Sequence, residues 1–238
     1  MTWNLEELRE LASSCLGKSI VSNLNPSLNS IVLKIAFAKY HADETQSIID
    51  ELISEAKKDE PTKIAKLILE QATDSEAGKK FRLAQFRAEA NIIAFAQTLH
   101  STADVLSQII FISLNLSNNQ NFKIKQDRLY LGNLTNELIR IGEYSTLTSS
   151  LEKLLNSNEF EYLSAFVNTT KHICLINSRY SLSFVEESDP CHGMRIADFA
   201  YKGKRFEKKW SEIFLGEDFK FLNTSIVESG IILNQFLK

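Results

Sequence analysis

Glycine, proline and cysteine are scarce in this sequence. Its 238 residues include only 8 Gly, 3 Pro and 3 Cys, so few positions favour tight turns. A long chain with few turns is typical of long helices, which favours a mainly α-helical fold. The three cysteines are widely spaced and odd in number, so they do not form a disulfide framework and fit a reducing compartment.

Charge and hydropathy exclude further classes of protein. The net charge of −3 gives no global attraction to nucleic acid, so contact with RNA or DNA needs a local basic patch. The first ten residues, MTWNLEELRE, are acidic and polar, unlike a signal peptide. The most apolar stretch, residues 91–116, carries too many polar groups for a membrane span. We therefore expect a cytoplasmic protein without membrane contact.

Apolar residues recur at helical spacing along most of the chain. Asn25 and Pro26 mark the start of a helix, because proline is favoured in a first turn. The run that begins near Ser75 predicts either one very long helix or two, with Ser101 or Thr102 capping the second. The Asn-rich residues 115–137 are interpreted as a loop. We expect helices over residues 4–16, 25–40, 43–58, 62–72, 75–114, 146–157, 159–178, 205–214 and 218–238.

The apolar period changes from helical to alternating near residue 179. Residues 179–187 and 193–201 alternate at period two and are separated by the turn cluster SDPCHG. This pattern predicts a β-hairpin over residues 179–201, inserted near the C-terminal third. We therefore predict a mainly α protein, a multi-helix bundle with that hairpin, forming a single domain over residues 1–238.

The sequence lacks the motifs by which common enzyme classes are recognised. It lacks a Gly-rich phosphate loop, a Cys-x-x-Cys pair, a His-Glu-x-x-His motif and a Gly-x-Ser-x-Gly elbow. His172, Cys174, Cys191 and His192 are ligand types that suit zinc. However, His172 and Cys174 lie about 200° apart around a helix, and adjacent Cys191 and His192 need special loop geometry. We therefore expect no metal site and no cofactor.

A polar stripe crosses the most apolar predicted helix. Gln97, His100 and Asp104 follow Glu89 at offsets of nearly whole helical turns, so they lie along one face. One interpretation is that this stripe is the solvent face of the helix. The other is that Gln97, His100 and Asp104 form the wall of a groove.

A second polar group stands in the segment FVNTTKH. Asn168 and His172 are four residues apart and share a helix face, with Lys171 beside them. A histidine that titrates near neutral pH, an amide and a cation suit acid/base chemistry and the holding of a phosphate. The alternative is a buried hydrogen-bonded network that only specifies packing.

An all-helical bundle with a late Asn-x-x-x-His helix resembles the HEPN superfamily. The resemblance implies metal-independent ribonucleases of toxin–antitoxin, abortive-infection and CRISPR systems, which commonly dimerise so that two motifs meet in one cleft. It further implies His172 as the acid/base, Asn168 as the residue that orients the phosphate, and Lys171 as a neutralising charge. Residues 97–104 would then form the opposite wall.

This sequence departs from the family motif at its arginine. The motif is an Arg followed after four to six residues by a His, so the Arg belongs at position 165, 166 or 167, where Ala165, Phe166 and Val167 stand. Two hypotheses follow: a degenerate ribonuclease of a bacterial defence or stress system, or a non-catalytic helical module. Both imply a homodimer or a partner, either RNA or protein.

The most basic stretch of the chain follows the predicted hairpin. It contains five cations with aromatic residues beside them, namely Lys202, Lys204, Arg205, Lys208 and Lys209. Such a stretch suits contact with nucleic acid, although basic runs are more often solvated helix starts.

Overall fold

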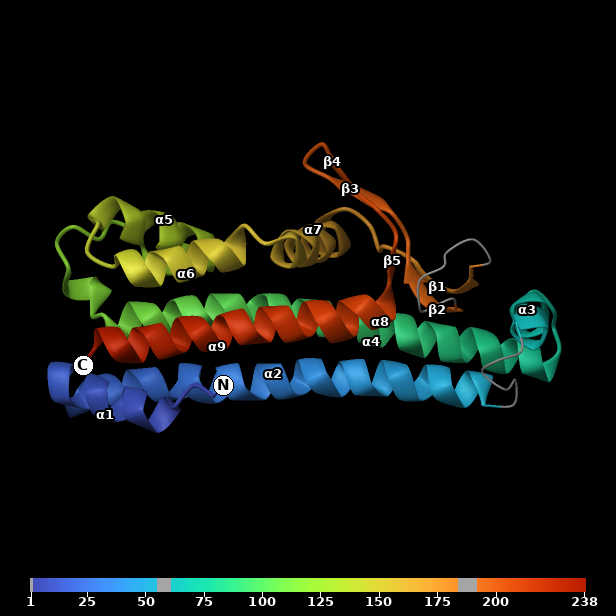
Figure 1. Ribbon diagram of the computed structural model, residues 1–238, viewed down its shortest axis with the longest axis horizontal. Helices are drawn as coiled ribbons and strands as arrows, with labels where there is room; N and C mark the ends of the chain where they lie inside the picture. The colour runs from blue at the N-terminus through green and yellow to red at the C-terminus, as the bar shows by residue number, and fades with distance from the viewer. Residues whose placement is uncertain (1, 55–60, 184–191) are drawn as a thin grey trace. The chain divides into compact units, whose positions relative to one another are not determined.

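The computed structural model of the chain describes residues 2–54, 61–183 and 192–238. Over these residues the protein is mainly α-helical with short antiparallel strands in the C-terminal third (Figure 1), as the sequence predicts. The helices are α1 (Leu5–Leu16), α2 (Lys18–Ile53), α3 (Pro61–Glu70), α4 (Glu76–Ser113), α5 (Leu131–Ile141), α6 (Ser145–Leu155), α7 (Asn158–His172), α8 (Ser211–Ile213) and α9 (Phe219–Phe236). The strands are β1 (Ser178–Leu182), β2 (His192–Ile196), β3 (Phe199–Tyr201), β4 (Lys204–Phe206) and β5 (Lys209–Trp210).

The chain divides into two compact units, each built from segments that are distant in sequence. The first unit comprises Met1–Ala36, Thr98–Leu163 and Lys220–Lys238, and the second comprises Phe37–Gln97 and Ser164–Phe219. Helices α2 and α4 contribute residues to both units. The single domain expected over residues 1–238 stays a prediction.

In the first unit the start of the chain is held by its last helix. The indole Nε1–H of Trp3 donates a 3.0 Å hydrogen bond to Asn234 Oδ1 on α9. Gly230 lies one turn earlier on α9, and a Cβ there would stand 2.1 Å from the Trp3 ring. The adjacent helix α1 begins where Asn4 Oδ1 accepts the backbone N–H of Glu7, a typical N-cap.

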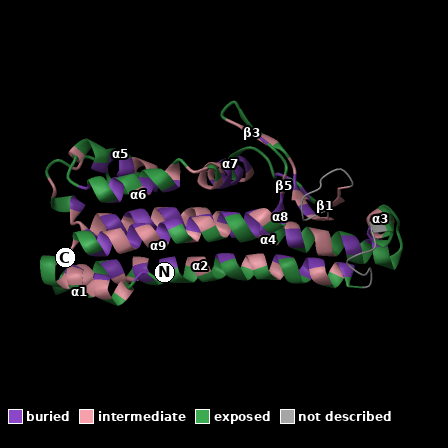
Figure 2. Cartoon of the chain, in the orientation of Figure 1, coloured by how far each residue is buried: buried purple, intermediate pink, exposed green. Residues whose placement is uncertain are grey.

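Helix α2 is one continuous helix where the sequence predicted two. Pro26 lies inside it and does not start it, so the start expected at Asn25 and Pro26 is wrong. Leu24, before the proline, and Leu28, after it, are both fully buried. Packing on both sides therefore outweighs the hydrogen bond that proline removes. Figure 2 shows buried and exposed residues alternating along this helix.

Helix α4 is also continuous, and the alternative of two helices is wrong. The hydroxyls of Ser101 and Thr102 both donate to the Thr98 carbonyl within the same helix, at 2.9 Å and 3.0 Å. They therefore bond back to the preceding turn and do not cap a new helix.

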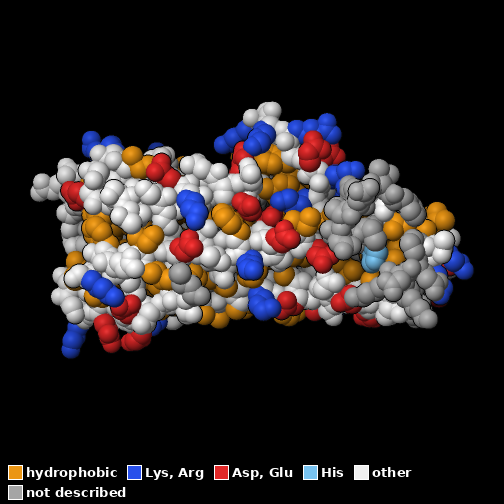
Figure 3. All heavy atoms as spheres, in the orientation of Figure 1, with side chains coloured by type: hydrophobic (Ala, Val, Ile, Leu, Met, Phe, Trp, Pro, Cys, Tyr) orange, Lys and Arg blue, Asp and Glu red, His pale blue; other side chains and the backbone are white. Residues whose placement is uncertain are grey.

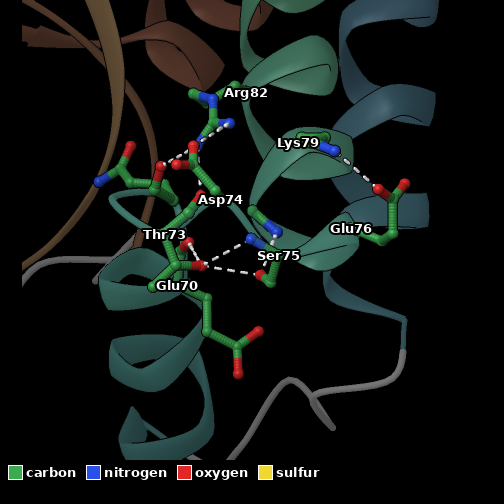
Figure 4. Close-up of polar contacts among 9 residues, drawn as sticks. Glu70, Thr73, Asp74, Ser75, Glu76, Lys79 and Arg82 are labelled. Atoms are coloured by element: carbon green, nitrogen blue, oxygen red, sulfur yellow. Dashed lines mark hydrogen bonds and ion pairs between the residues drawn. The ribbon is translucent and has the colours of Figure 1, made fainter.

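The turn between α3 and α4 is closed by side chains (Figure 4). Ser75 Oγ accepts the backbone N–H of Gly78, which caps the start of α4. Arg82, one turn further on, donates to the carbonyls of Gln71 and Thr73. Gly78 permits the close approach, since a Cβ there would lie 2.4 Å from the Glu70 carbonyl oxygen.

Helix α5 begins inside residues 115–137, which the sequence pattern predicted to be a loop. That prediction is wrong for residues 131–137, which belong to the helix Leu131–Ile141, with Leu131, Leu134 and Leu138 buried. These leucines follow the i, i+3, i+7 spacing of a helix face, and the Asn-rich residues before them obscured that pattern. Gly142, with φ at 80°, ends the helix.

The strands form two small antiparallel sheets in the second unit. β1 pairs with β2, with Tyr180 opposite Met194, and β5 adds to the other edge of β2. The predicted hairpin is confirmed in this pairing, although its connecting residues 184–191 lie outside the described residues. The alternating run 193–201 holds two strands, β2 and β3, in place of one.

The helix predicted over residues 205–214 is wrong for its first half. β3 and β4 form a second hairpin, with Phe199 opposite Phe206, and the following helix begins only at Ser211. The two-residue turn between β3 and β4 has φ values of 49° at Lys202 and 80° at Gly203. Positive φ at both central residues is the geometry that suits tight hairpins. The C-terminal helix predicted from residue 218 is confirmed as α9.

Aromatic rings form the core of the second unit and position α7. Phe214 lies 5.4 Å from Phe95 and 5.7 Å from Phe166, measured between ring centres. Phe166 also meets Phe199 of the β3–β4 hairpin edge-on at 6.1 Å. Aromatic contacts add to the stability gained by burial, and the edge-on contact with Phe199 fixes α7 against the hairpin.

Candidate functional site

Helix α7 carries Asn168, Lys171 and His172 in its C-terminal half. Its first turn contains Glu159 and Glu161, and its last turn contains Lys171 and His172. Acids at the N-terminus and cations at the C-terminus both suit the helix dipole. The two cations therefore stabilise the end of the helix, whether or not they bind a ligand.

Asn168 is half-buried and uses its amide inside the helix. Its Nδ2 donates a 2.8 Å hydrogen bond to the backbone carbonyl of Ser164, one turn earlier. This contact fixes the orientation of the side chain, with the amide nitrogen turned toward the helix backbone.

Lys171 and His172 are exposed, so they do not form a buried network. Within the described ranges no hydrogen bond or ion pair joins either of them to Asn168. The structure therefore places three polar groups on neighbouring turns of one helix end without linking them. Their proposed roles at a phosphate stay predictions.

The positions that would hold the family's arginine belong to the core. Ala165, Phe166 and Val167 are 2%, 0% and 1% exposed. An arginine at these positions would bury a guanidinium among aromatic rings, at a high desolvation cost.

Gln97, His100 and Asp104 are half-buried on α4. The His100 ring stacks on Phe160 in the first unit, with centres 5.9 Å apart and planes 16° from parallel. Phe160 is in the first turn of α7, twelve residues before His172. The expectation that Gln97, His100 and Asp104 face the Asn168 group across a groove stays a prediction.

The basic stretch near the second hairpin is divided by pairing. Lys209 turns inward and donates to Asp218 at 2.6 Å, while Arg205 pairs with Asp198 at 2.8 Å. Lys202, at the tip, lies over the Tyr201 ring at 5.3 Å. Figure 3 shows Lys and Arg side chains around the projecting hairpin, with acidic groups beside them. Acidic partners therefore offset part of the positive charge that the sequence shows in this stretch.

A polar cluster lies between α4 and β1 and was not predicted from the sequence. Glu89 Oε1 accepts the backbone N–H of Ser178 at 2.7 Å, and Gln85 Oε1 accepts that of Tyr180 at 3.2 Å. The phenol oxygen of Tyr180 lies 2.9 Å from His192 Nδ1. Four residues of helix and two of strand advance by nearly the same length, about 6 to 7 Å. Because of this equal spacing, two side chains one helical turn apart can reach alternate backbone groups of a strand. The sequence alone could not indicate this contact, since it does not show which helix packs on which strand.

A cavity of about 600 Å³ lies beside α5 in the first unit and was not predicted either. Its signal was the run Lys123–Ile124–Lys125–Gln126–Asp127–Arg128, where three cations fall within six residues. A loop prediction for residues 115–137 gives these cations no helix to face, so the run alone did not indicate a cavity.

Metal ligands do not gather in the described part of the chain. No group of three or more His, Cys, Asp or Glu side chains there is arranged to hold a metal ion. Cys174 is an exposed free thiol, and Cys191 lies outside the described residues.

Comparison of the chain with protein-family models, with curated proteins and with solved structures finds no match. Among the helices of the described residues, none has the length and apolar character that crossing a membrane requires.

Proposed function

We propose that this protein is a HEPN-like module that binds RNA without cleaving it. The contrast along α7 carries the proposal: Lys171 and His172 are exposed, whereas the positions of the family's arginine, 165–167, are buried and apolar. Without a guanidinium, bidentate support of the scissile phosphate is lost there. The resemblance implies a bacterial defence or stress system as the setting.

Binding requires less of the site than cleavage does. Exposed cations contact RNA phosphates and release counterions, which supplies sequence-independent affinity. Lys171 provides such a charge at the end of α7, and Lys202 and Lys208 provide exposed charges elsewhere in the same unit.

A metal-free cleavage and binding assay tests this function. Wild type is expected to bind labelled single-stranded RNA and leave it intact, and the Lys171→Ala/His172→Ala variant is expected to bind more weakly. Lys18→Ala, which removes an exposed lysine of α2, is the matched control and should bind like wild type.

Each contrary result has a definite meaning. Cleavage by wild type that His172→Ala abolishes, with both proteins equally folded, would make His172 catalytic and overturn the non-cleaving proposal. RNA binding that is absent from wild type would overturn the module itself. Because Lys171 and His172 are exposed, circular dichroism and urea unfolding should show no loss of fold.

A second candidate function, self-association as a homodimer, is favoured by apolar groups on the surface of the second unit. Phe37 and Tyr40 of α2 are 54% and 60% exposed, and Leu83 and Phe86 of α4 are 59% and 67% exposed. The two helices lie side by side there, since Arg87 pairs with Glu44 at 3.2 Å. Exposed large apolar side chains on neighbouring helices suit a protein–protein contact.

Sedimentation velocity tests the homodimer. Wild type should sediment as a dimer at micromolar concentration, and the Phe37→Ser/Phe86→Ser variant as a folded monomer. Leu69→Ser removes a large apolar side chain that is 73% exposed on α3 and is the control that should stay dimeric. A monomeric wild type would refute this function and leave RNA binding to be judged separately.

A further inference from the structure

The cavity beside α5 lies between that helix and the chain segment that precedes it. Its volume is about 600 Å³, within the range of small-molecule sites. Most of its lining residues are polar or charged, among them Lys123, Lys125, Arg128, Asn136, Glu137 and Arg140. All of these residues belong to the first unit, so the cavity is contained in one compact body.

Three side chains of α5 hold the segment that forms the other wall. Asn133 Nδ2 donates to the Arg128 carbonyl at 3.1 Å, and Glu137 Oε1 accepts the Lys123 backbone N–H at 2.6 Å. Arg140 donates to the carbonyl of Asn121. Positions 133, 137 and 140 share one helix face. The backbone of the wall is thus fixed at three points without using the side chains of Lys123, Lys125 or Arg128.

The acidic group on the floor of the cavity is already neutralised. Glu137 is 9% exposed, and its carboxylate accepts hydrogen bonds from Arg140 Nε at 2.9 Å and Nη2 at 2.7 Å. This pairing with Arg140 lowers the pKa of Glu137, and the bond from the Lys123 backbone lowers it further. Glu137 therefore stays ionised, and its charge is matched by the adjacent guanidinium.

The rim carries more positive than negative charge. Lys123, Lys125 and Arg128 are exposed, and among the described residues none of them forms an ion pair. The cavity lining contains two acids: Asp127, beside these cations, and Glu137, whose charge is matched by Arg140. Three cations against one acid leave an excess of two positive charges, in a chain whose net charge is −3. Local charge of this sign concentrates anions.

We propose that this cavity binds a phosphate-bearing small molecule of nucleotide size. Arg128 suits bidentate contact with phosphate oxygens, while Lys123 and Lys125 act as point charges. The exposed Asn136 supplies an amide donor on the α5 side. Because the wall is already held by α5, binding costs little ordering of the chain. This site is separate from the residues proposed to contact RNA on α7.

Calorimetric titration of the full chain tests the site with three probes. ATP and inorganic pyrophosphate are expected to bind, whereas adenosine, which lacks phosphate, is expected not to. The Lys125→Ala/Arg128→Ala variant should weaken ATP binding by at least about tenfold. Lys18→Ala is the control and should bind ATP like wild type. Neither substitution touches the backbone contacts that hold the wall.

The outcomes separate this proposal from that of RNA binding. Failure of both ATP and pyrophosphate to bind at millimolar concentration would overturn it, and so would equal binding by the Lys125→Ala/Arg128→Ala variant. Adenosine binding as tightly as ATP would show that phosphate is not what is recognised. RNA binding by wild type is measured in parallel and depends on Lys171 and His172, so either proposal can fail alone.

Discussion

The backbone N–H of Ser178 donates a 2.7 Å hydrogen bond to the Glu89 carboxylate, across 89 residues of sequence. Ser178 lies on β1, an edge strand, and is 1% exposed. An edge strand presents unpaired backbone groups that invite pairing with other chains. Helix α4 therefore covers this edge with side chains, Glu89 at Ser178 and Gln85 at Tyr180.

Replacing Glu89 with alanine should lower the free energy of unfolding by about 1–3 kcal/mol, since a buried N–H then loses its acceptor. Urea denaturation measures the change. Glu89→Gln keeps an acceptor oxygen and is the control expected to lose less. Equal losses in the two variants would show that the Ser178 contact contributes nothing.

Gly230→Ala should destabilise the first unit. The added Cβ would stand 2.1 Å from the Trp3 ring, so either the indole or α9 must move, at about 1–3 kcal/mol. Gly216→Ala is the control, because a Cβ there meets nothing within 4 Å, and it should be neutral or stabilising by up to about 1 kcal/mol. Urea unfolding of both variants decides the point, and equal stability would refute the close packing of Trp3 on Gly230.

The Lys209–Asp218 pair should be costly to break. Their side chains are 23% and 7% exposed and lie 2.6 Å apart. Asp218→Ala leaves a partly buried ammonium without this partner, and should cost about 3–5 kcal/mol. The double variant Lys209→Met/Asp218→Leu should cost less than Asp218→Ala alone. Thermal unfolding measures both, and a loss in the double variant as large as that of Asp218→Ala would count against the cost of leaving Lys209 without this partner.

The exposed pair Arg205–Asp198 provides the comparison. It is similarly short at 2.8 Å, but the two side chains are 69% and 49% exposed. Arg205→Ala should therefore cost less than about 1 kcal/mol. A loss as large as that of Asp218→Ala would show that burial is not what distinguishes the two pairs.

Acid should remove the contribution of Glu137. Pairing with Arg140 lowers the folded-state pKa of Glu137 below its unfolded value. The stability it provides is therefore present above the unfolded pKa, about 4.3, and is lost as the pH falls through the lower folded pKa. Wild type should exceed Glu137→Gln in stability at pH 7, and the difference should shrink below about pH 4.5.

Urea unfolding at a series of pH values from neutral to acid checks this prediction. Glu152→Gln, which changes an exposed acid on α6, is the control whose difference from wild type should stay nearly constant. A Glu137→Gln difference that does not change with pH would show that the Arg140 contact does not favour the ionised form.

Helical segments were predictable where the signal was local. The Asn4 cap, the acids of the first turn and the leucines of α1 are close in sequence, and α1 forms over that region. The full extent of α2 was not predictable, because Pro26 looks like a boundary locally. For α4 the sequence predicted one long helix or two, and the structure shows one. Burial of residues such as Leu24 and Leu28 on both sides of the proline keeps α2 continuous.

The sequence predicted which polar residues share a face of α7, but not their burial or their neighbours. The sequence places Asn168 and His172 on one helix face, and α7 bears this out. It did not reveal that Lys171 and His172 are exposed while Phe166 meets Phe199 and Phe214. Those ring contacts join segments that are distant in sequence, so the spacing of nearby residues cannot predict them.

The sequence by itself determined that this protein is mainly helical, because apolar period and the scarcity of glycine and proline act within a few residues. The tertiary structure alone decided which polar groups are satisfied and which remain available. It pairs Lys209 with Asp218 and Glu137 with Arg140, and it leaves Lys125 and Arg128 exposed at a cavity. Lysines and arginines of the same sequence therefore differ in burial and in partners, and both depend on how distant elements pack.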